Sequence, residues 1–244
     1  MLIYILLVLL FATVIRSAFG FGEALVAVPM LGLAIPLATA APLAVAMSVT
    51  VAIVILLQDW RKMHIRSAGI LLAASLAGIP LGLLLLTHGN QLVIRVLLAL
   101  IIILFAILGL TGWRPATLHR DKPLWITTCG FIAGILGGAY GLNGPPLVIY
   151  GAMRQWSAQQ FRATLQGYFL PASFLGLGGY FAAGLWTPEV TRLYFISLPV
   201  VIPAVFVGRA INRRFQGDRF YRYVYATLLV VGCIFLAQAL VKTA

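Results

Sequence analysis

Two stretches decide the fold: FGFGEALVAVPML at residues 19–31 and YGLNGPPL at residues 140–147. Both are rich in glycine, and each interrupts an otherwise apolar part of the chain. The apolar runs beside them are short, and they cover residues 2–15, 24–36, 124–136 and 145–153. Crossing the hydrocarbon core takes about 20 apolar helical residues. Each stretch therefore predicts a pair of half-length helices that meet at a break.

The composition around these breaks is that of an integral membrane protein. Of 244 residues, 62% are hydrophobic and only 9% are charged, whereas a soluble domain carries roughly 25% charged residues. Several apolar runs are long enough to span a bilayer, or extend readily into their flanks to do so. They cover residues 40–58, 67–87, 92–111, 163–183, 193–208 and 224–241. The sequence predicts an all-α polytopic protein, with the lipid bilayer as its solvent.

The chain also repeats itself. Gly20 and Gly141 are 121 residues apart, and Pro80 and Pro203, each preceded by a long apolar run, are 123 apart. These offsets predict a first repeat over residues 1–111, a polar linker over 112–123 and a second repeat over 124–244. Each repeat has five segments and opens with a broken-helix hairpin. Because five is odd, the second repeat inserts upside down.

Loop charges support this inversion, because cytoplasmic loops are rich in Lys and Arg. Equivalent loops of the two halves differ in charge, and the pairs are 59–66 with 184–192, 87–91 with 209–222, and 37–39 with 154–162. In the first pair the first-half loop is the basic one, and in the other two it is the second-half loop. The linker carries three cations against Asp121. These charges predict a cytoplasmic linker and place both termini outside.

Broken helices inside a membrane indicate a binding site, because backbone groups that leave a helix in lipid lose their partners. Discontinuous helices of inverted-repeat transporters point their electropositive N-termini at anionic substrates. The alternative is that the glycines only let helices pack closely. The predicted binding residues are Gly20, Phe21, Gly22 and Glu23 in the first break and Gly141, Leu142, Asn143 and Gly144 in the second.

Polar residues near the breaks are further candidates. Glu23 is the acidic residue that lies away from the loops; it either couples transport to protons or stabilises the first turn of its half-helix and pairs with Arg16. Arg16 either attracts the anion or extends to the membrane surface, and the second alternative is the favoured expectation. The remaining candidates form interhelical hydrogen bonds or contact substrate, and they are Ser48, Thr50, Thr164, Gln166 and Ser173.

Other functional classes find little support. The net charge of +12 lies mostly between apolar segments, where it sets topology, so nucleic-acid binding is not expected. The three histidines fall in loops and the two cysteines are far apart. No metal site, cofactor or enzymatic activity is expected.

The motifs at residues 19–31 and 140–147 resemble the two repeated signatures of the sulfite exporter TauE/SafE family of anion permeases. The resemblance covers essentially the whole chain, although Glu23 stands where a glycine is common in the first signature. It implies transport of sulfite or organosulfonates across the bacterial inner membrane.

The leading hypothesis is therefore a secondary transporter that binds a small anion between the two breaks and works by alternating access, with or without protons. The alternative is a membrane assembly or sensor subunit that does not transport. The glycine spacings are compatible with a homo-oligomer as well as a monomer.

Overall fold

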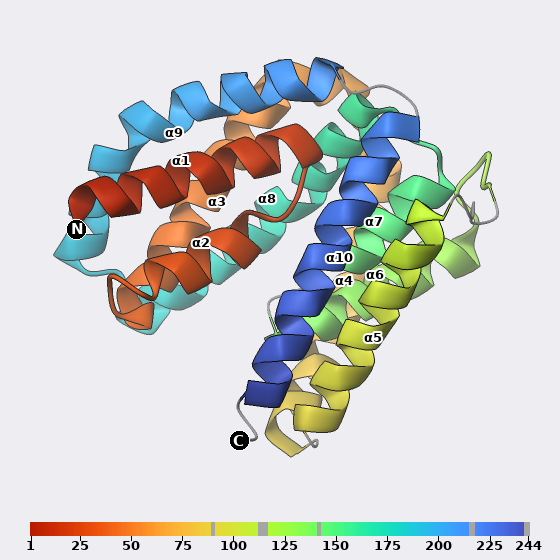
Figure 1. Ribbon diagram of the computed structural model, residues 1–244, viewed down its shortest axis with the longest axis horizontal. Coiled ribbons are helices and arrows are strands. Elements are labelled where there is room, and N and C mark those ends of the chain that lie inside the picture. The colour runs from red at the N-terminus through yellow and green to blue at the C-terminus, as the bar shows by residue number, and fades with distance from the viewer. Residues whose placement is uncertain (89–90, 112–116, 141–142, 215–217, 242–244) are drawn as a thin grey trace. The chain divides into compact units, whose positions relative to one another are not determined.

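The computed structural model describes residues 1–88, 91–111, 117–140, 143–214 and 218–241, and Figure 1 shows its helices. All regular structure in these residues is helical. The α-helices are α1 (Leu2–Phe19), α2 (Glu23–Leu31), α3 (Leu37–Asp59), α4 (Ile65–His88), α5 (Gln91–Leu110), α6 (Pro123–Tyr140), α7 (Gly144–Met153), α8 (Ala158–Ala182), α9 (Pro188–Arg214) and α10 (Asp218–Val241). A short 3-10 turn, η1 (Trp60–Lys62), follows α3. The all-helical prediction is confirmed.

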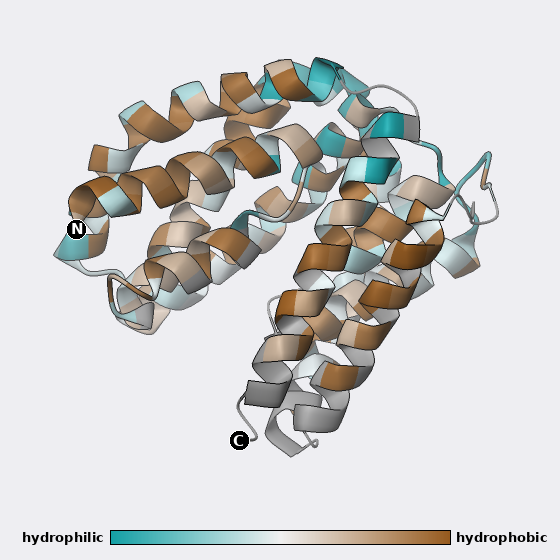
Figure 2. Cartoon of the chain, in the orientation of Figure 1, coloured by the Kyte–Doolittle hydropathy of each residue, from teal (hydrophilic) through white to brown (hydrophobic). Residues whose placement is uncertain are grey.

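Several of these helices are suited to a membrane. Within the described residues, four segments are long and apolar enough to span one: Leu2–Phe19, Ala38–Lys62, Ile65–Gly82 and Pro188–Arg214. Figure 2 shows apolar residues along most of the helices and a hydrophilic C-terminal end of α9. That end carries Arg213 and Arg214 in its last turn. The chain is a multi-pass membrane protein.

Two helices, α1 and α6, are longer than the sequence predicts. The sequence predicts two half-length helices at each break, but α1 has 18 residues and continues through Arg16 to Phe19. Helix α6 likewise has 18 residues. Only α2, with 9 residues, and α7, with 10, are half-length. Each break therefore separates a full-length helix from a short one.

The helices group into two compact units. Unit 1 consists of Met1–Ala68 and Ala158–Phe215, and unit 2 of Gly69–Ser157 and Gln216–Ala244. Each unit draws segments from both halves of the sequence. The repeat boundaries at 1–111, 112–123 and 124–244 stay a prediction.

Unit 1 has an apolar core built mainly from α1, α2, α3 and α9. Ile5 and Leu9 of α1 are fully buried in it, together with Leu43 and Met47 of α3. Helices α1 and α9 lie side by side (Figure 1). Gly208 permits this approach, since a Cβ there would lie 2.4 Å from the Cβ of Ser17.

Unit 2 also depends on glycine for close helix packing. A Cβ on Gly134 of α6 would lie 2.0 Å from the carbonyl oxygen of Ser75 in α4, and one on Gly78 of α4 would lie 2.2 Å from the carbonyl oxygen of Phe131. Small residues at membrane helix interfaces allow backbones to approach in this way. The described part of the linker also belongs to this unit.

The linker is held against the end of α7. The Leu118 N–H donates to the Met153 carbonyl at 2.8 Å, and Arg154 donates to the Leu118 carbonyl at 2.7 Å. Arg154 also pairs with Asp121 at 2.9 Å, and the Tyr150 hydroxyl contacts the same carboxylate. Leu118 and Asp121 of the linker are therefore held against α7.

Candidate functional site

The first break is a tight turn that only glycines make without strain. Gly20 has φ +86° and Gly22 has φ +96°, both in the left-handed region. Gly20 ends α1, and its N–H donates to the Arg16 carbonyl. A Cβ on Gly20 would lie 3.1 Å from the Cα of Arg162, so α8 packs directly against the turn. Both glycines are required, the first also by this close approach.

Arg16 is the centre of the polar contacts at this break. Its side chain is buried in the last turn of α1 and forms an ion pair with Glu23, the first residue of α2. It also donates to the Ser48 hydroxyl of α3, and through Nε and Nη2 to the Gln166 side-chain oxygen at 3.0 and 2.7 Å. The expectation that Arg16 extends to the membrane surface is wrong, because these partners compensate its charge inside the protein. We call Arg16, Glu23, Ser48 and Gln166 the Arg16 cluster.

Helix α8 provides one side of the cluster. Gln166 also donates from Nε2 to the Gly20 carbonyl at 2.8 Å, so a single side chain holds both Arg16 and the turn. The ring of Phe169 lies 5.4 Å from the Arg16 guanidinium carbon, a distance at which a cation and an aromatic face attract. Ser173 lies 3.3 Å from Ser48, oxygen to oxygen. Ser48, Gln166 and Ser173, expected candidates, thus come together.

Glu23 keeps one oxygen without a hydrogen-bond partner in the described part of the chain. Its Oε2 faces Arg16, while Oε1 is buried and unpaired, and the residue is 2% exposed. Leaving a buried polar atom unsatisfied costs about 1–3 kcal/mol, and more for a charged group. The unpaired oxygen is therefore a place where a proton or a ligand would be stabilising.

Two expected candidates have other partners. The Thr50 hydroxyl lies 2.7 Å from the Tyr194 hydroxyl of α9. The Thr164 hydroxyl accepts the His64 backbone N–H at 3.0 Å. The first contact joins α3 to α9, and the second joins the connection before α4 to α8. The partners of Arg16 described above include neither residue.

The second break is described in part. Gly141 and Leu142 lie outside the described residues. Asn143 precedes α7 without a side-chain cap, and Gly144 is the first residue of that helix. A Cβ on Gly137 would lie 3.3 Å from the Cβ of Asn143, so the asparagine packs on the last turns of α6. The expected convergence of the two breaks stays a prediction.

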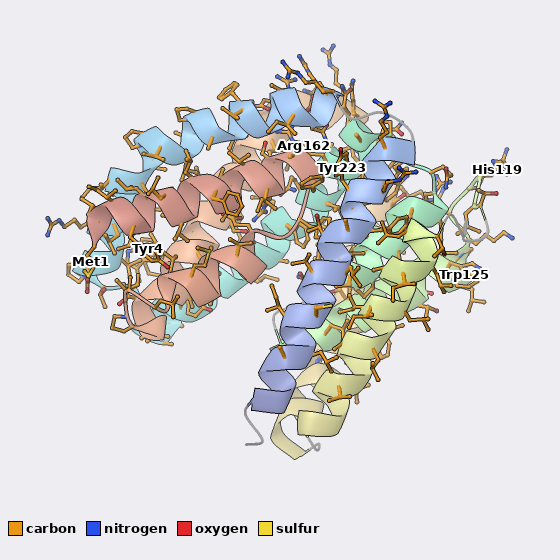
Figure 3. All side chains as sticks on the ribbon, viewed as in Figure 1. Met1, Tyr4, His119, Trp125, Arg162 and Tyr223 are labelled. Carbon is orange, nitrogen blue, oxygen red and sulfur yellow. The ribbon has the colours of Figure 1, made fainter. Side chains whose placement is uncertain are left out.

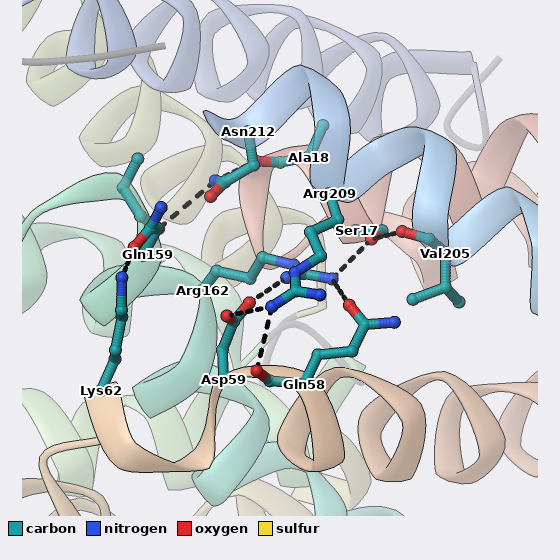
Figure 4. A network of polar contacts seen from close by, with 11 residues as sticks. Ser17, Ala18, Gln58, Asp59, Lys62, Gln159, Arg162, Val205, Arg209 and Asn212 are labelled. Carbon is teal, nitrogen blue, oxygen red and sulfur yellow. Dashed lines mark hydrogen bonds and ion pairs between the residues drawn. The ribbon is translucent and has the colours of Figure 1, made fainter. Parts of the chain in front are cut away.

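A second polar cluster in unit 1 escaped the sequence analysis. Figure 4 shows Arg162 of α8 in contact with Asp59 of α3 and, at 2.9 Å, with the Ser17 hydroxyl of α1. Arg209 of α9 pairs with the same carboxylate at 2.9 Å. Figure 3 places Arg162 inside unit 1, where it is fully buried. These three charges were assigned to loops, yet they lie at helix ends that pack together.

Periodicity is the signal that could have found the second cluster. Residues 162, 166, 169 and 173 are spaced i, i+4, i+7 and i+11, which places them on one face of a helix. Three of the four are polar, in a segment otherwise suited to lipid. Such a polar stripe faces protein or a polar site, because charged groups exposed to lipid are costly.

The described residues hold no group of three or more His, Cys, Asp or Glu side chains that could bind a metal ion. Comparison with known proteins gives one family: the model described as Sulfite exporter TauE/SafE matches residues 5–236. No curated protein and no solved structure matches the chain.

Proposed function

Because the chain belongs to the sulfite exporter TauE/SafE family, a family of membrane transporters, we propose that it is a secondary transporter of small anions. We infer sulfur oxyanions or organosulfonates as substrates, carried across the bacterial inner membrane by alternating access. The observation that supports this function best is the buried Arg16 cluster at a helix break. A cation, a hydroxyl and the N-terminus of α2 meet there, and all three attract oxyanions.

The ion pair within the cluster gives a reason for proton coupling. Two charges 4 Å apart interact by about 4 kcal/mol at an effective dielectric constant of 20. An anion near both side chains is therefore attracted by Arg16 and repelled by ionised Glu23 with energies of similar size. When Glu23 takes up a proton, the repulsion disappears and the Arg16 charge becomes available. One proton then binds with each monovalent anion.

The unpaired Oε1 of Glu23 is the atom on which we place that proton. Protonation at this atom removes the negative charge and weakens the attraction between Glu23 and Arg16. The guanidinium group can then direct N–H donors to the anion in place of the carboxylate. Ser48 supplies a hydroxyl from α3, and the first N–H groups of α2 complete a set of donors suited to an oxyanion.

Alternating access would use the predicted inverted repeats. In this proposal the halves 1–111 and 124–244 insert in opposite orientations, with both termini outside and the linker in the cytoplasm. The second break, at residues 141–144, is the counterpart of the first. Gly137 and Gly144 stand at the positions 121 residues after Arg16 and Glu23, so the ionisable pair belongs to the first repeat alone.

Flux through the purified protein tests this proposal. Proteoliposomes containing the wild type should take up sulfite and methanesulfonate in a saturable manner. Arg16→Gln should remove this uptake, and Arg16→Lys, which keeps the charge but not the planar fork, should retain part of it. Arg66→Gln is the matched control, because Arg66 is an exposed arginine of the same unit. Uptake that survives Arg16→Gln would place the site elsewhere. Anion binding without any flux would favour a sensor subunit.

A further inference from the structure

The cluster around Asp59 has more positive than negative charge. Arg162 and Arg209 share one carboxylate, so two cations and one anion leave a net charge of +1. The side chains of Arg162 and Asp59 are 0% and 5% exposed, and that of Arg209 is 22% exposed. Burying uncompensated charge is unfavourable in a protein interior. Among the side chains that the structure describes, the cluster therefore lacks one negative partner.

No other carboxylate of unit 1 can supply that partner. The unit contains three acidic residues, and Glu23 is paired with Arg16. Glu189 lies in the first turn of α9, 20 residues before Arg209, which is about 30 Å along a helix. Lys62, a further cation drawn in Figure 4, contacts Gln159.

The neutral groups of the cluster are already used, while several donors are not. Ser17 accepts from Arg162 and donates to the Val205 carbonyl at 2.6 Å. The side-chain oxygen of Gln58 accepts from Arg162, and its backbone carbonyl accepts from Arg209. Three buried nitrogens of this cluster have no hydrogen-bond acceptor among the residues that the structure describes: Nε of Arg162, Nε of Arg209 and Nε2 of Gln58. Excess positive charge and unused donors occur together.

We propose that Arg162 and Arg209 form an oxyanion-binding site of their own, separate from the Arg16 cluster. Guanidinium groups bind sulfate-like and phosphate-like oxygens with paired N–H donors. A bound oxyanion supplies the missing negative charge, with Asp59 holding the two arginines in place. Exposed cations, among them Arg213 and Arg214, occupy the same end of α9 and attract anions from solution.

The site lies close to the Arg16 cluster along two helices. Ser17, which contacts Arg162, follows Arg16 in sequence, and Arg162 precedes Gln166 by one turn of α8. In a transporter the second site would hold an anion before or after it occupies the Arg16 cluster. This role rests on the proposed function, whereas binding at the site does not.

Sulfate binding to the purified full-length protein tests the site. The thermal midpoint is measured in detergent at pH 8, in sodium sulfate and in sodium chloride of equal ionic strength. Sulfate should raise the wild-type midpoint. Arg209→Gln should weaken sulfate binding by about tenfold or more, as expected when a charged hydrogen-bond donor is lost. Arg213→Gln, one turn further along α9, removes the same charge from an exposed position and should leave sulfate binding intact.

The stability of the variants in chloride separates a ligand site from a purely structural bridge. Arg209→Gln leaves the neutral Arg162–Asp59 pair, so its midpoint in chloride should equal or exceed that of the wild type. Asp59→Asn raises the net charge to +2, and its midpoint should fall in chloride and recover in sulfate. A fall of the Arg209→Gln midpoint in chloride, with its sulfate response retained, would overturn the proposal. An equal loss of response in Arg213→Gln would also overturn it, since this shows general screening.

Two further measurements identify the bound oxyanion and distinguish this site from the proposed transport site. Phosphatidylglycerol in mixed micelles tests a lipid headgroup as the occupant. An Arg209-dependent rise with this lipid, compared with phosphatidylcholine, shows a headgroup at the same site. In Glu23→Gln, the Arg209-dependent sulfate response should persist. Its persistence in an Arg16→Gln protein would support the second site even if the transport proposal fails.

Discussion

Replacing Glu23 by glutamine isolates the charge that the coupling proposal depends on. The substitution keeps the size and shape of the side chain and one oxygen acceptor, and it removes the negative charge. Arg16 then keeps Gln166 and Ser48 as partners but loses its carboxylate. Removing one partner of a buried ion pair costs about 3–5 kcal/mol when the other charge stays uncompensated. We expect the variant to be less stable without a ligand and to be stabilised by an added anion.

The pH dependence of anion binding follows from the same charges. In the wild type, the anion binds together with a proton on Glu23, so binding is favoured at low pH. At pH values where Glu23 is ionised in the free protein, each unit by which the pH rises weakens anion binding by about 1.36 kcal/mol. This corresponds to a tenfold rise in Kd. Two units of pH should therefore raise Kd about 100-fold. The glutamine variant has no proton to take up, and its Kd should not depend on pH.

Methanesulfonate is the ligand of choice for this measurement, because it carries one negative charge throughout the pH range. Its Kd is measured at several pH values between 6 and 9 for the wild type, Glu23→Gln and the control Glu189→Gln. Glu189 is exposed in the first turn of α9, so its loss should leave the wild-type slope unchanged. In proteoliposomes, the rate of methanesulfonate uptake by Glu23→Gln should not change when a pH gradient is imposed. A Glu23→Gln protein that keeps the tenfold rise per pH unit would refute the coupling mechanism.

Two backbone predictions concern the glycines. Gly20→Ala should lower stability by about 1–2 kcal/mol or more, because alanine is strained at φ +86° and its Cβ would lie 3.1 Å from the Arg162 Cα. Thermal unfolding in detergent measures this loss, and an unchanged midpoint would contradict the described turn. Gly134→Ala should cost about 1–3 kcal/mol, because its Cβ would overlap the Ser75 carbonyl. Gly178→Ala, in a helix with open space around that position, should be neutral or stabilising by the same assay.

Much of the fold could be predicted because membrane helices depend on local composition. Apolar length predicts where α3, α4, α5 and α10 lie to within a few residues at most boundaries. Two glycines marked the break before α2, and glycine and proline marked the start of α7. The end of α1 could not be placed in the same way, because Arg16 reads as the end of an apolar run. In the structure its side chain is instead buried and donates to Gln166, 150 residues away.

The sequence predicted which residues belong to the candidate site, but it did not predict most of the contacts between them. Arg16, Glu23, Ser48 and Gln166 were candidates, and pairing of Glu23 with Arg16 was one of the alternatives. No local pattern shows that Ser48 and Gln166 contact the same arginine. Hydropathy assigned Asp59 and Arg162 to loops, because charged residues at segment ends usually meet solvent. Their burial depends on the ends of α3 and α8 packing together, which is a tertiary effect. The inverted repeat stays a prediction from offsets and loop charges.

The position of Arg162 and Gln166 on one face of α8 has a mechanical consequence. The two side chains are one helical turn apart and lie before Pro171, which removes a backbone hydrogen bond further along the helix. A rotation of this part of α8 about its axis would withdraw both side chains from α1 at the same time. Such a rotation would disturb the Arg16 cluster and the Arg162–Asp59 pair together. One rotation of α8 would expose both groups of polar side chains, and a ligand bound to either group would oppose that rotation.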